Sequence, residues 1–368
     1  MKIIMYEMKK IWNWKIVGLI LIIATLFYQL FLSFSIDNFR RSHPQIEIHD
    51  FAVEMTERYG SSLSGEEIDQ FISEKKPVYE QELDNYFDTN PVFEEAGLAD
   101  YKEYELLHEK EYKDLTKEEL KAIEAMSGEQ TNYVVFKLQS LDFITEELSY
   151  VEGPNNIMSA YTFETTMDYI AGLTILVILL SLIMAAPVVV NDRMKNIHFL
   201  QYTSKNGRKI IIQQFKAVLI SGLLLTTISI LFFGRLLLRN DILTFWNNNV
   251  NSFLIIGVNS LFDITFGNYL FWSILFIYLL NISVTFFAFI ISRYSQNMIT
   301  LIMKLVPVFA LFTGVSALIF QWMFSPYNRV YQLISVAGIE GMIPVLLLLL
   351  AIMISIFVLK REKRIDIF

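Results

Sequence analysis

Long runs of apolar residues alternate with polar stretches along this chain, and several runs are long enough to cross a bilayer. A transmembrane helix needs about 20 predominantly apolar residues. Six such runs occur, at residues 16–36, 169–190, 211–234, 269–292, 299–323 and 342–359. The pattern predicts an all-α polytopic membrane protein with six transmembrane helices. Because six is even, we expect both termini on the same side of the membrane.

The longest polar stretch, residues 37–168, has the spacing of helices that bury one face. Ser64 with Glu67 three residues later is typical of a capped helix start, and Thr116 with Glu119 repeats the device. Apolar residues then recur at helical spacing. They are Ile68, Phe71 and Ile72, then Leu120 and Ile123, then Val134, Leu138, Leu141 and Leu148. This predicts a helical domain inserted between the first and second transmembrane helices.

Composition agrees with a membrane protein. Hydrophobic residues make up 54% of the 368 residues, against 18% charged, which is too apolar for a soluble chain of this length. The absence of cysteine excludes disulfides and thiolate metal sites. The first run has a basic flank like a signal peptide, but it is long and no small-x-small cleavage motif follows. We interpret it as a retained anchor.

The first 15 residues predict a short amphipathic helix. Ile4, Met8, Ile11 and Trp12 recur at helical spacing, opposite a set of lysines that comprises Lys2, Lys9 and Lys10. This pattern is typical of a helix lying on the inner membrane surface. The alternative is a frayed start to the first transmembrane helix.

Charge predicts the orientation. Residues 37–168 hold 31 acidic and 11 basic side chains, net −20, whereas the rest holds 7 acidic and 19 basic, net +12. Basic clusters fall on the side of the N-terminus, with Arg235 and Arg239 as exceptions, and the positive-inside rule places that side in the cytoplasm. We therefore expect a multi-pass protein of the cytoplasmic membrane. Its predicted parts are a cytoplasmic helix at 1–15, a transmembrane helix at 16–36, an acidic extracytoplasmic domain at 37–168, five transmembrane helices within 169–359 and a cytoplasmic tail at 360–368.

Motifs for catalysis are lacking. No phosphate-binding loop is present, so the chain does not hydrolyse ATP in the usual way, and the histidines form no zinc-binding HExxH. His43 and His49 fit either a metal pair or an ordinary exposed pair. Few charges lie within the apolar runs, which argues against a proton relay. Asn281, Ser283 and Thr285 are placed to hydrogen-bond with neighbouring helices. We predict no enzymatic activity, no cofactor and no nucleic-acid partner for this chain.

The segment between the second and third apolar runs, residues 191–216, mixes charge with bulky apolar side chains. Arg193 and Lys195 precede a group of apolar residues comprising Ile197, Phe199, Leu200 and Tyr202. A short amphipathic helix of this kind either docks on a protein partner or lies flat on anionic lipid, held by its basic residues.

The order of these features resembles the permease subunit of a type 2 ABC exporter. In that family the cytoplasmic segment typically begins with an acidic residue and Arg, continues into a short coupling helix and a Pro-Ser-Arg-like turn, and ends at a Lys. The matching residues are Asp192 and Arg193 at the start, residues 196–203 in the helix, Arg208 at the turn and Lys216 at the foot of the third span. The usual Gly is replaced around Lys195 and Asn196, and the Pro near Ser204 is missing.

The resemblance implies partners and a mechanism. A separate ATPase, which would bind ATP and Mg²⁺, would dock on a coupling segment at 191–210, through Ile197, Phe199, Leu200 and Tyr202. A second permease, identical or similar, would complete the membrane dimer. The cargo would be amphipathic, such as a peptide antibiotic, a lipid or a cell-envelope compound. One alternative is a membrane-anchored sensor that binds a ligand with its acidic external domain; another, a secondary transporter, lacks the expected ionisable residues and inverted repeats.

The predicted orientation is tested by labelling. Single cysteines introduced at Ser62 and Ser127 into this cysteine-free chain are expected to react with an impermeant maleimide in intact cells. Protection of both positions until lysis would contradict an extracytoplasmic domain at 37–168.

Overall fold

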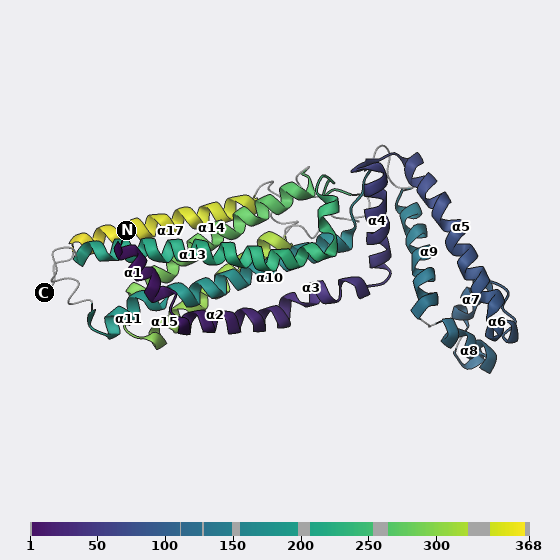
Figure 1. Cartoon of the computed structure of the whole chain (residues 1–368), viewed down its shortest axis with the longest axis horizontal. Coiled ribbons are helices and arrows are strands. Elements are labelled where there is room, and N and C mark those ends of the chain that lie inside the picture. The colour runs from purple at the N-terminus through teal and green to yellow at the C-terminus, as the bar shows by residue number, and fades with distance from the viewer. Residues whose placement is uncertain are drawn as a thin grey trace. The chain divides into compact units, whose positions relative to one another are not determined.

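The computed structural model describes residues 2–110, 112–126, 129–148, 155–197, 207–252, 264–322 and 339–364. The described residues are mostly helical (Figure 1). They belong to two compact units. The first comprises Met1–Phe39, Glu164–Leu243 and Gly257–Phe368, and the second comprises Arg40–Phe163 and Thr244–Ile256.

Six helices among the described residues are long and apolar enough to cross a membrane, which confirms the predicted number. They run over Trp14–Leu32, Ala160–Met194, Ile210–Asn240, Phe266–Arg293, Met298–Phe320 and Gly341–Arg361. The second candidate is 35 residues long and begins well before the predicted position, because polar residues of its first turns also adopt the helix.

The first unit contains the long helices (Figure 1). Its elements are α1 (Lys2–Ile11), α2 (Trp14–Phe27) with a π-helical turn (Tyr28–Leu32), α3 (Phe34–Asp37), most of α10 (Ala160–Ala185), α11 (Pro187–Met194), α13 (Gly207–Leu237) with a 3₁₀ turn (Leu238–Asn240), α14 (Phe266–Arg293), α15 (Met298–Ala317) with a π-helical turn (Leu318–Trp322), and α17 (Ile339–Arg364).

Helix α14 packs against α13, α15 and α17, and it makes side-chain hydrogen bonds to α13. The amide of Asn281 donates to the Gly222 carbonyl at 3.1 Å and to the Thr226 hydroxyl at 2.5 Å, both on α13. A Cβ at Gly222 would lie 2.9 Å from the Thr285 hydroxyl, so glycine permits this close approach. The predicted interhelical role of Asn281 is confirmed. Ser283 instead bonds to its own helix, at the Leu279 carbonyl.

The second unit is built from shorter helices and one pair of strands. Its elements are a 3₁₀ turn (Phe39–Arg41), α4 (Gln45–Tyr59), β1 (Ser62–Leu63), α5 (Gly65–Thr89), α6 (Pro91–Glu95), α7 (Tyr101–Glu105), 3₁₀ turns (Leu106–Glu109, Tyr112–Asp114 and Ile242–Phe245), α8 (Lys117–Met126), α9 (Glu129–Leu148) and β2 (Asn155–Asn156). β1 and β2 are antiparallel, with Ser62 opposite Asn156.

Both predicted capping boxes are present. Ser64 and Glu67 exchange side-chain-to-backbone hydrogen bonds at the start of α5, and Thr116 and Glu119 do so at the start of α8. The core face predicted for α5 is also confirmed, because Ile68 and Phe71 are fully buried. The prediction for α8 is only partly right. Leu120 and Ile123 are half-buried, while Ala122 and Met126 fill the core.

The second unit also includes residues 244–256, which the sequence analysis did not anticipate. The amide of buried Asn248 donates to the Thr56 hydroxyl at 3.0 Å and to the Ile157 carbonyl. The hydroxyl of Ser252 accepts from the Met158 N–H at 2.8 Å. Residues 244–252 are therefore held in this unit by hydrogen bonds of Asn248 and Ser252.

Buried His49 lies between two parts of the second unit. Its Nδ1 is 2.6 Å from the Thr162 hydroxyl, and its ring packs edge-on against Phe245. His43 instead pairs with Glu47 at 2.5 Å, so the two histidines have separate partners. Burial, with a smaller effect of Arg40, lowers the pKa of His49 to about 3, and the imidazole is neutral near pH 7.

The pKa of His49 predicts a loss of stability in acid. The unfolded imidazole binds a proton below about pH 6.5, whereas the folded one does not until about pH 3. The free energy of unfolding should therefore fall between these values by up to about 1.4 kcal/mol per pH unit. Thermal unfolding at pH 7 and pH 5, followed by Trp246 fluorescence in a background with Trp12, Trp14, Trp272 and Trp322 replaced by Phe, measures this. His49→Gln, which keeps a partner for Thr162, should show a smaller dependence; equal slopes would contradict the assignment.

Candidate functional site

The second transmembrane helix ends in a joint that is stabilised by α14. Pro187 begins α11 and has no N–H to donate. One residue before it, the Ala186 carbonyl accepts from the Ser292 hydroxyl of α14, and the same hydroxyl accepts from the Val190 N–H at 3.2 Å. The serine is thus inserted where Val190 would ordinarily bond directly to Ala186. Proline and an inserted side chain are both recognised causes of a helix bend.

Arg193 makes a second contact between α11 and the end of α14. Its guanidinium donates to the Ser295 carbonyl at 3.0 Å, just beyond the last residue of α14. A basic side chain is favourable here because helix carbonyls at a C-terminus carry partial negative charge. Together Ser292 and Arg193 fix α11 to one end of α14.

Asn196 ends α11 in the left-handed region, with φ of 56°. Its N–H donates to the Arg193 carbonyl at 2.9 Å and satisfies part of the helix end. Asparagine tolerates this backbone conformation better than most non-glycine residues. A tight turn at this position therefore does not require glycine.

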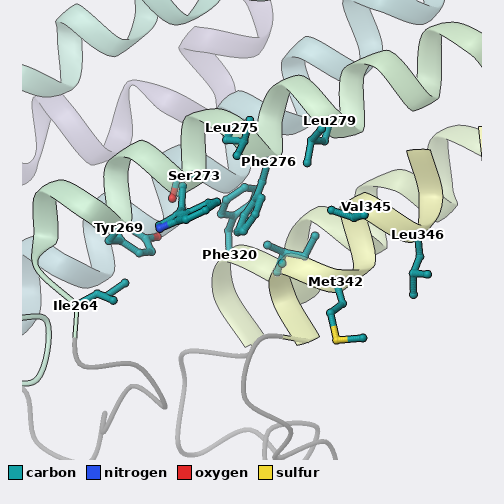
Figure 2. A pocket seen from close by; sticks show the side chains of 13 residues that line it. Ile264, Tyr269, Ser273, Leu275, Phe276, Leu279, Phe320, Met342, Val345 and Leu346 are labelled. Carbon is teal, nitrogen blue, oxygen red and sulfur yellow. The ribbon is translucent and has the colours of Figure 1, made fainter. Parts of the chain in front are cut away.

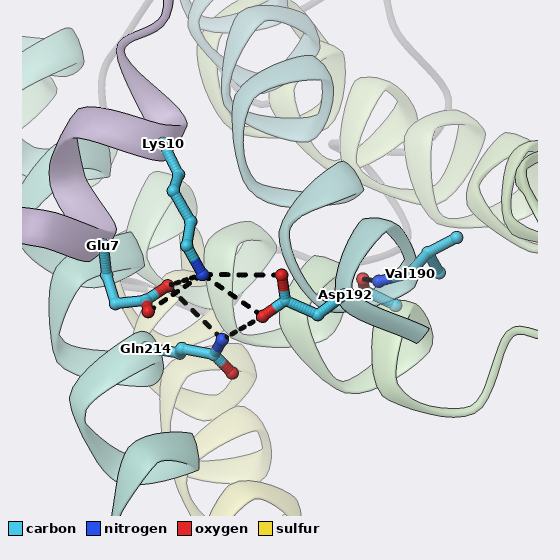
Figure 3. Close-up of polar contacts among 6 residues, drawn as sticks. Glu7, Lys10, Val190, Asp192 and Gln214 are labelled. Carbon is cyan, nitrogen blue, oxygen red and sulfur yellow. Dashed lines mark hydrogen bonds and ion pairs between the residues drawn. The ribbon is translucent and has the colours of Figure 1, made fainter. Parts of the chain in front are cut away.

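A buried ionic cluster joins α11 to the N-terminal helix and α13 (Figure 3). The ammonium of Lys10 lies 3.0 Å from Glu7 on its own helix and 3.3 Å from the Asp192 carboxylate on α11. The Gln214 amide on α13 donates to Asp192 at 2.7 Å and to Glu7 at 3.3 Å. Four side chains from three helices therefore satisfy one another.

Because the carboxylates of Glu7 and Asp192 are buried, this cluster depends on the positive charge of Lys10. The side chains of Glu7 and Asp192 are only 5% and 8% exposed, and that of Lys10 is 34% exposed. Burial by itself lowers the pKa of Lys10, but hydrogen bonds and attraction from Glu7 and Asp192 outweigh it, so the pKa is raised. Lys10 is therefore charged at physiological pH, and it forms ion pairs with two carboxylates that have little access to water.

The N-terminal helix is thus part of the helix bundle. Besides the cluster, the Trp12 indole donates to the Ser221 hydroxyl of α13 at 3.0 Å, and Ile11 is buried. The predicted helix is present, and Ile11 lies on its buried side as expected. Lys10, predicted opposite the apolar face, instead turns toward Asp192. Ile3, Met5 and Tyr6 are exposed.

The structure describes some of the predicted site residues and not others. Asp192 and Arg193 lie on α11 and make the contacts above. Ile197 is partly exposed just beyond the turn, and Lys216 is exposed on α13, so neither joins the cluster. Arg208 belongs to the first turn of α13. Phe199, Leu200 and Tyr202 lie outside the described residues.

Three residues of this site were missed in the sequence analysis. Glu7 is the only acidic residue before the first span, and Gln214 is a polar residue within an apolar run; both were signals of a buried polar contact. Ser292 carried no such signal, because serine is common in transmembrane helices and its partners lie about 100 residues away. Among the residues described, no group of three or more His, Asp or Glu side chains is arranged to hold a metal ion.

No family model matches this chain, and no curated protein or solved structure matches it either. Function is therefore argued from the geometry of the site.

Removal of the Lys10 charge should destabilise the first unit. In Lys10→Met the carboxylates of Glu7 and Asp192 stay buried without their cation, which in a fully buried pair costs about 3–5 kcal/mol. Because Lys10 is one-third exposed, we expect roughly 1–3 kcal/mol. Detergent-induced unfolding in mixed micelles measures the change. Lys9→Met, at an exposed neighbouring position, is the matched control and should have little effect. Equal stability of the two variants would contradict the ionic role of Lys10.

Proposed function

We propose that this chain is the transmembrane permease subunit of an ATP-driven exporter of the cytoplasmic membrane. In this proposal both termini are cytoplasmic and residues 37–168 are extracytoplasmic. ATP binding and hydrolysis belong to a separate ATPase subunit that docks on residues 191–210, and a second permease completes the pore.

The observation that carries the proposal is that α11, the helix in which this segment begins, is bonded to several other helices of the first unit. Asp192 links it to α1 and α13, while Arg193 links it to the end of α14. A force applied to residues that follow α11 would therefore reach several membrane helices at once. A loop that merely connected two helices would need no such anchoring.

The joint at Pro187 suggests how such a force would be used. Movement of α11 would act on α10 through the interruption between Ala186 and Val190. There the Ser292 hydroxyl already bonds to the backbone groups of both residues. Because the hydroxyl bonds to both sides of the interruption, the helix can bend there without leaving the Val190 N–H or the Ala186 carbonyl unpaired in a medium that offers no water. We propose that ATPase closure bends this joint and opens the pathway for an amphipathic cargo, such as a peptide antibiotic, a lipid or a cell-envelope compound.

Substitution in the proposed coupling helix tests this function. Burial of a large apolar side chain contributes roughly 1.5–3 kcal/mol. Truncation of Phe199 and Leu200 together to Ala should therefore weaken ATPase docking by about tenfold or more, while insertion into the membrane is unchanged. The measurement is the amount of ATPase that copurifies with the permease.

A charge-neutralised variant of Lys195, Arg208 and Lys209 is the matched comparison. If the segment only lies on anionic lipid, these charges matter and the apolar pair does not. Full ATPase recovery with the Phe199/Leu200 double variant would contradict the coupling role. Recovery of a receptor or kinase in place of an ATPase would favour the sensor alternative.

A further inference from the structure

The first unit contains a cavity between the beginning of α14 and the beginning of α17. Its volume is about 560 Å³, within the range of sites that hold a small organic molecule. Its lining includes Tyr269, Trp272 and Phe276 of α14, together with Phe320 and Met342. Figure 2 shows Tyr269 and Phe276 on α14 and Met342 on α17.

The chemistry of the lining selects an apolar occupant. Among the described residues that line the cavity none is charged, and the side-chain oxygens are those of Tyr269 and Ser273. Both of these residues are 3% exposed. A metal ion, nucleotide or sugar would lose its hydration without gaining a counter-charge or enough hydrogen bonds. Ordered water also needs more polar partners than this cavity offers.

The position of the cavity identifies the source of that occupant. Trp272, Met342 and Leu346 line it and are 47%, 54% and 58% exposed, on helices that can cross a membrane. The side of the cavity that they form therefore faces hydrocarbon. Tyr269 and Trp272 lie in the first two turns of α14, and aromatic residues of this kind concentrate where the hydrocarbon meets the headgroups. The molecules that meet this opening at high concentration are membrane lipids.

Gly341 contributes to the shape of the cavity. A Cβ at this position would lie 3.3 Å from the Phe276 ring, closer than ordinary contact. A glycine therefore lets the Phe276 ring lie against the backbone at the start of α17. The wall is consequently formed by flat aromatic surface and backbone, which suits a flexible chain of methylene groups.

We propose that this cavity binds one acyl chain of a membrane phospholipid, whose headgroup remains at the membrane surface. Because the lining residues that the structure describes carry no charge, recognition is of the chain and not of the headgroup. The inference requires only that the helices span a membrane, and it is independent of the exporter proposal.

Quenching of Trp272 fluorescence tests this site. In delipidated, detergent-solubilised full-length chain with Trp12, Trp14, Trp246 and Trp322 replaced by Phe, phosphatidylglycerol with brominated acyl chains is titrated. We expect saturable quenching at low lipid-to-protein ratio. Brominated phosphatidylcholine should give the same affinity within about twofold, and a short-chain phospholipid should not compete.

Two substitutions on α17 separate the cavity from the general lipid contact of Trp272. Val345→Phe places a ring in the cavity and should weaken the saturable component by at least about tenfold. Leu349→Phe makes a comparable change one turn along, at an exposed residue that does not line the cavity, and should leave it unchanged. Size-exclusion profiles verify that all variants are folded.

Quenching that is never saturable, or that is equally strong in Val345→Phe, would overturn the proposal. So would a strong preference for one headgroup. Native mass spectrometry of the protein as first purified gives a second readout, in which a phospholipid should remain bound. Retention of a peptide or another molecule without an acyl chain in this cavity would also be contrary to the proposal.

Discussion

The contact between α1, α11 and α13 depends on one lysine, Lys10. Lys10 forms ion pairs with two carboxylates that have little access to water, Glu7 on its own helix and Asp192 on α11. Such an arrangement is stable only while every member has its partner, because a buried charge left alone is strongly unfavourable. The position of α1, the start of the proposed coupling segment and the adjoining turn of α13 at Gln214 are therefore mutually dependent. An isolated surface helix at the N-terminus would have none of these constraints.

The same requirement for internal partners explains the interruption between α10 and α11. In a bilayer a backbone group without a partner has no water to bond, so an opened bond between an N–H and the carbonyl four residues before it is tolerated only where another group takes over. Ser292 does so from α14, at a distance that lets one hydroxyl contact both Ala186 and Val190. In the second unit, Asn248 has an equivalent role among shorter helices, because its buried amide bonds to Thr56 and Ile157. Replacement of residues 38–165 by a linker would therefore remove Thr56 and Ile157, the hydrogen-bond partners of Asn248.

Features whose partners are close in sequence were predictable, whereas those between distant residues were not. The capping boxes of Ser64 and Thr116 follow from residues three apart, and the six spans follow from hydropathy alone. Helical periodicity also placed Ile68 and Phe71 in the core. Helical periodicity does not identify contacts between residues 182 positions apart, such as Lys10 with Asp192. Asp192 was singled out for a resemblance to a family motif, and its buried partners on α1 and α13 could be identified only from the structure.

The claim that α1 and α11 are joined through charge is tested most directly by a double-mutant cycle. The free energy of unfolding is measured for the wild type, Lys10→Met, Asp192→Asn and the double variant in the same mixed micelles. The account predicts that the losses of unfolding free energy in the two single variants do not sum to the loss in the double variant. The interaction energy should be at least about 1 kcal/mol, as found for residues in one ion-pair network. Losses that add to within about 0.5 kcal/mol would show that Lys10 and Asp192 act independently and would contradict it.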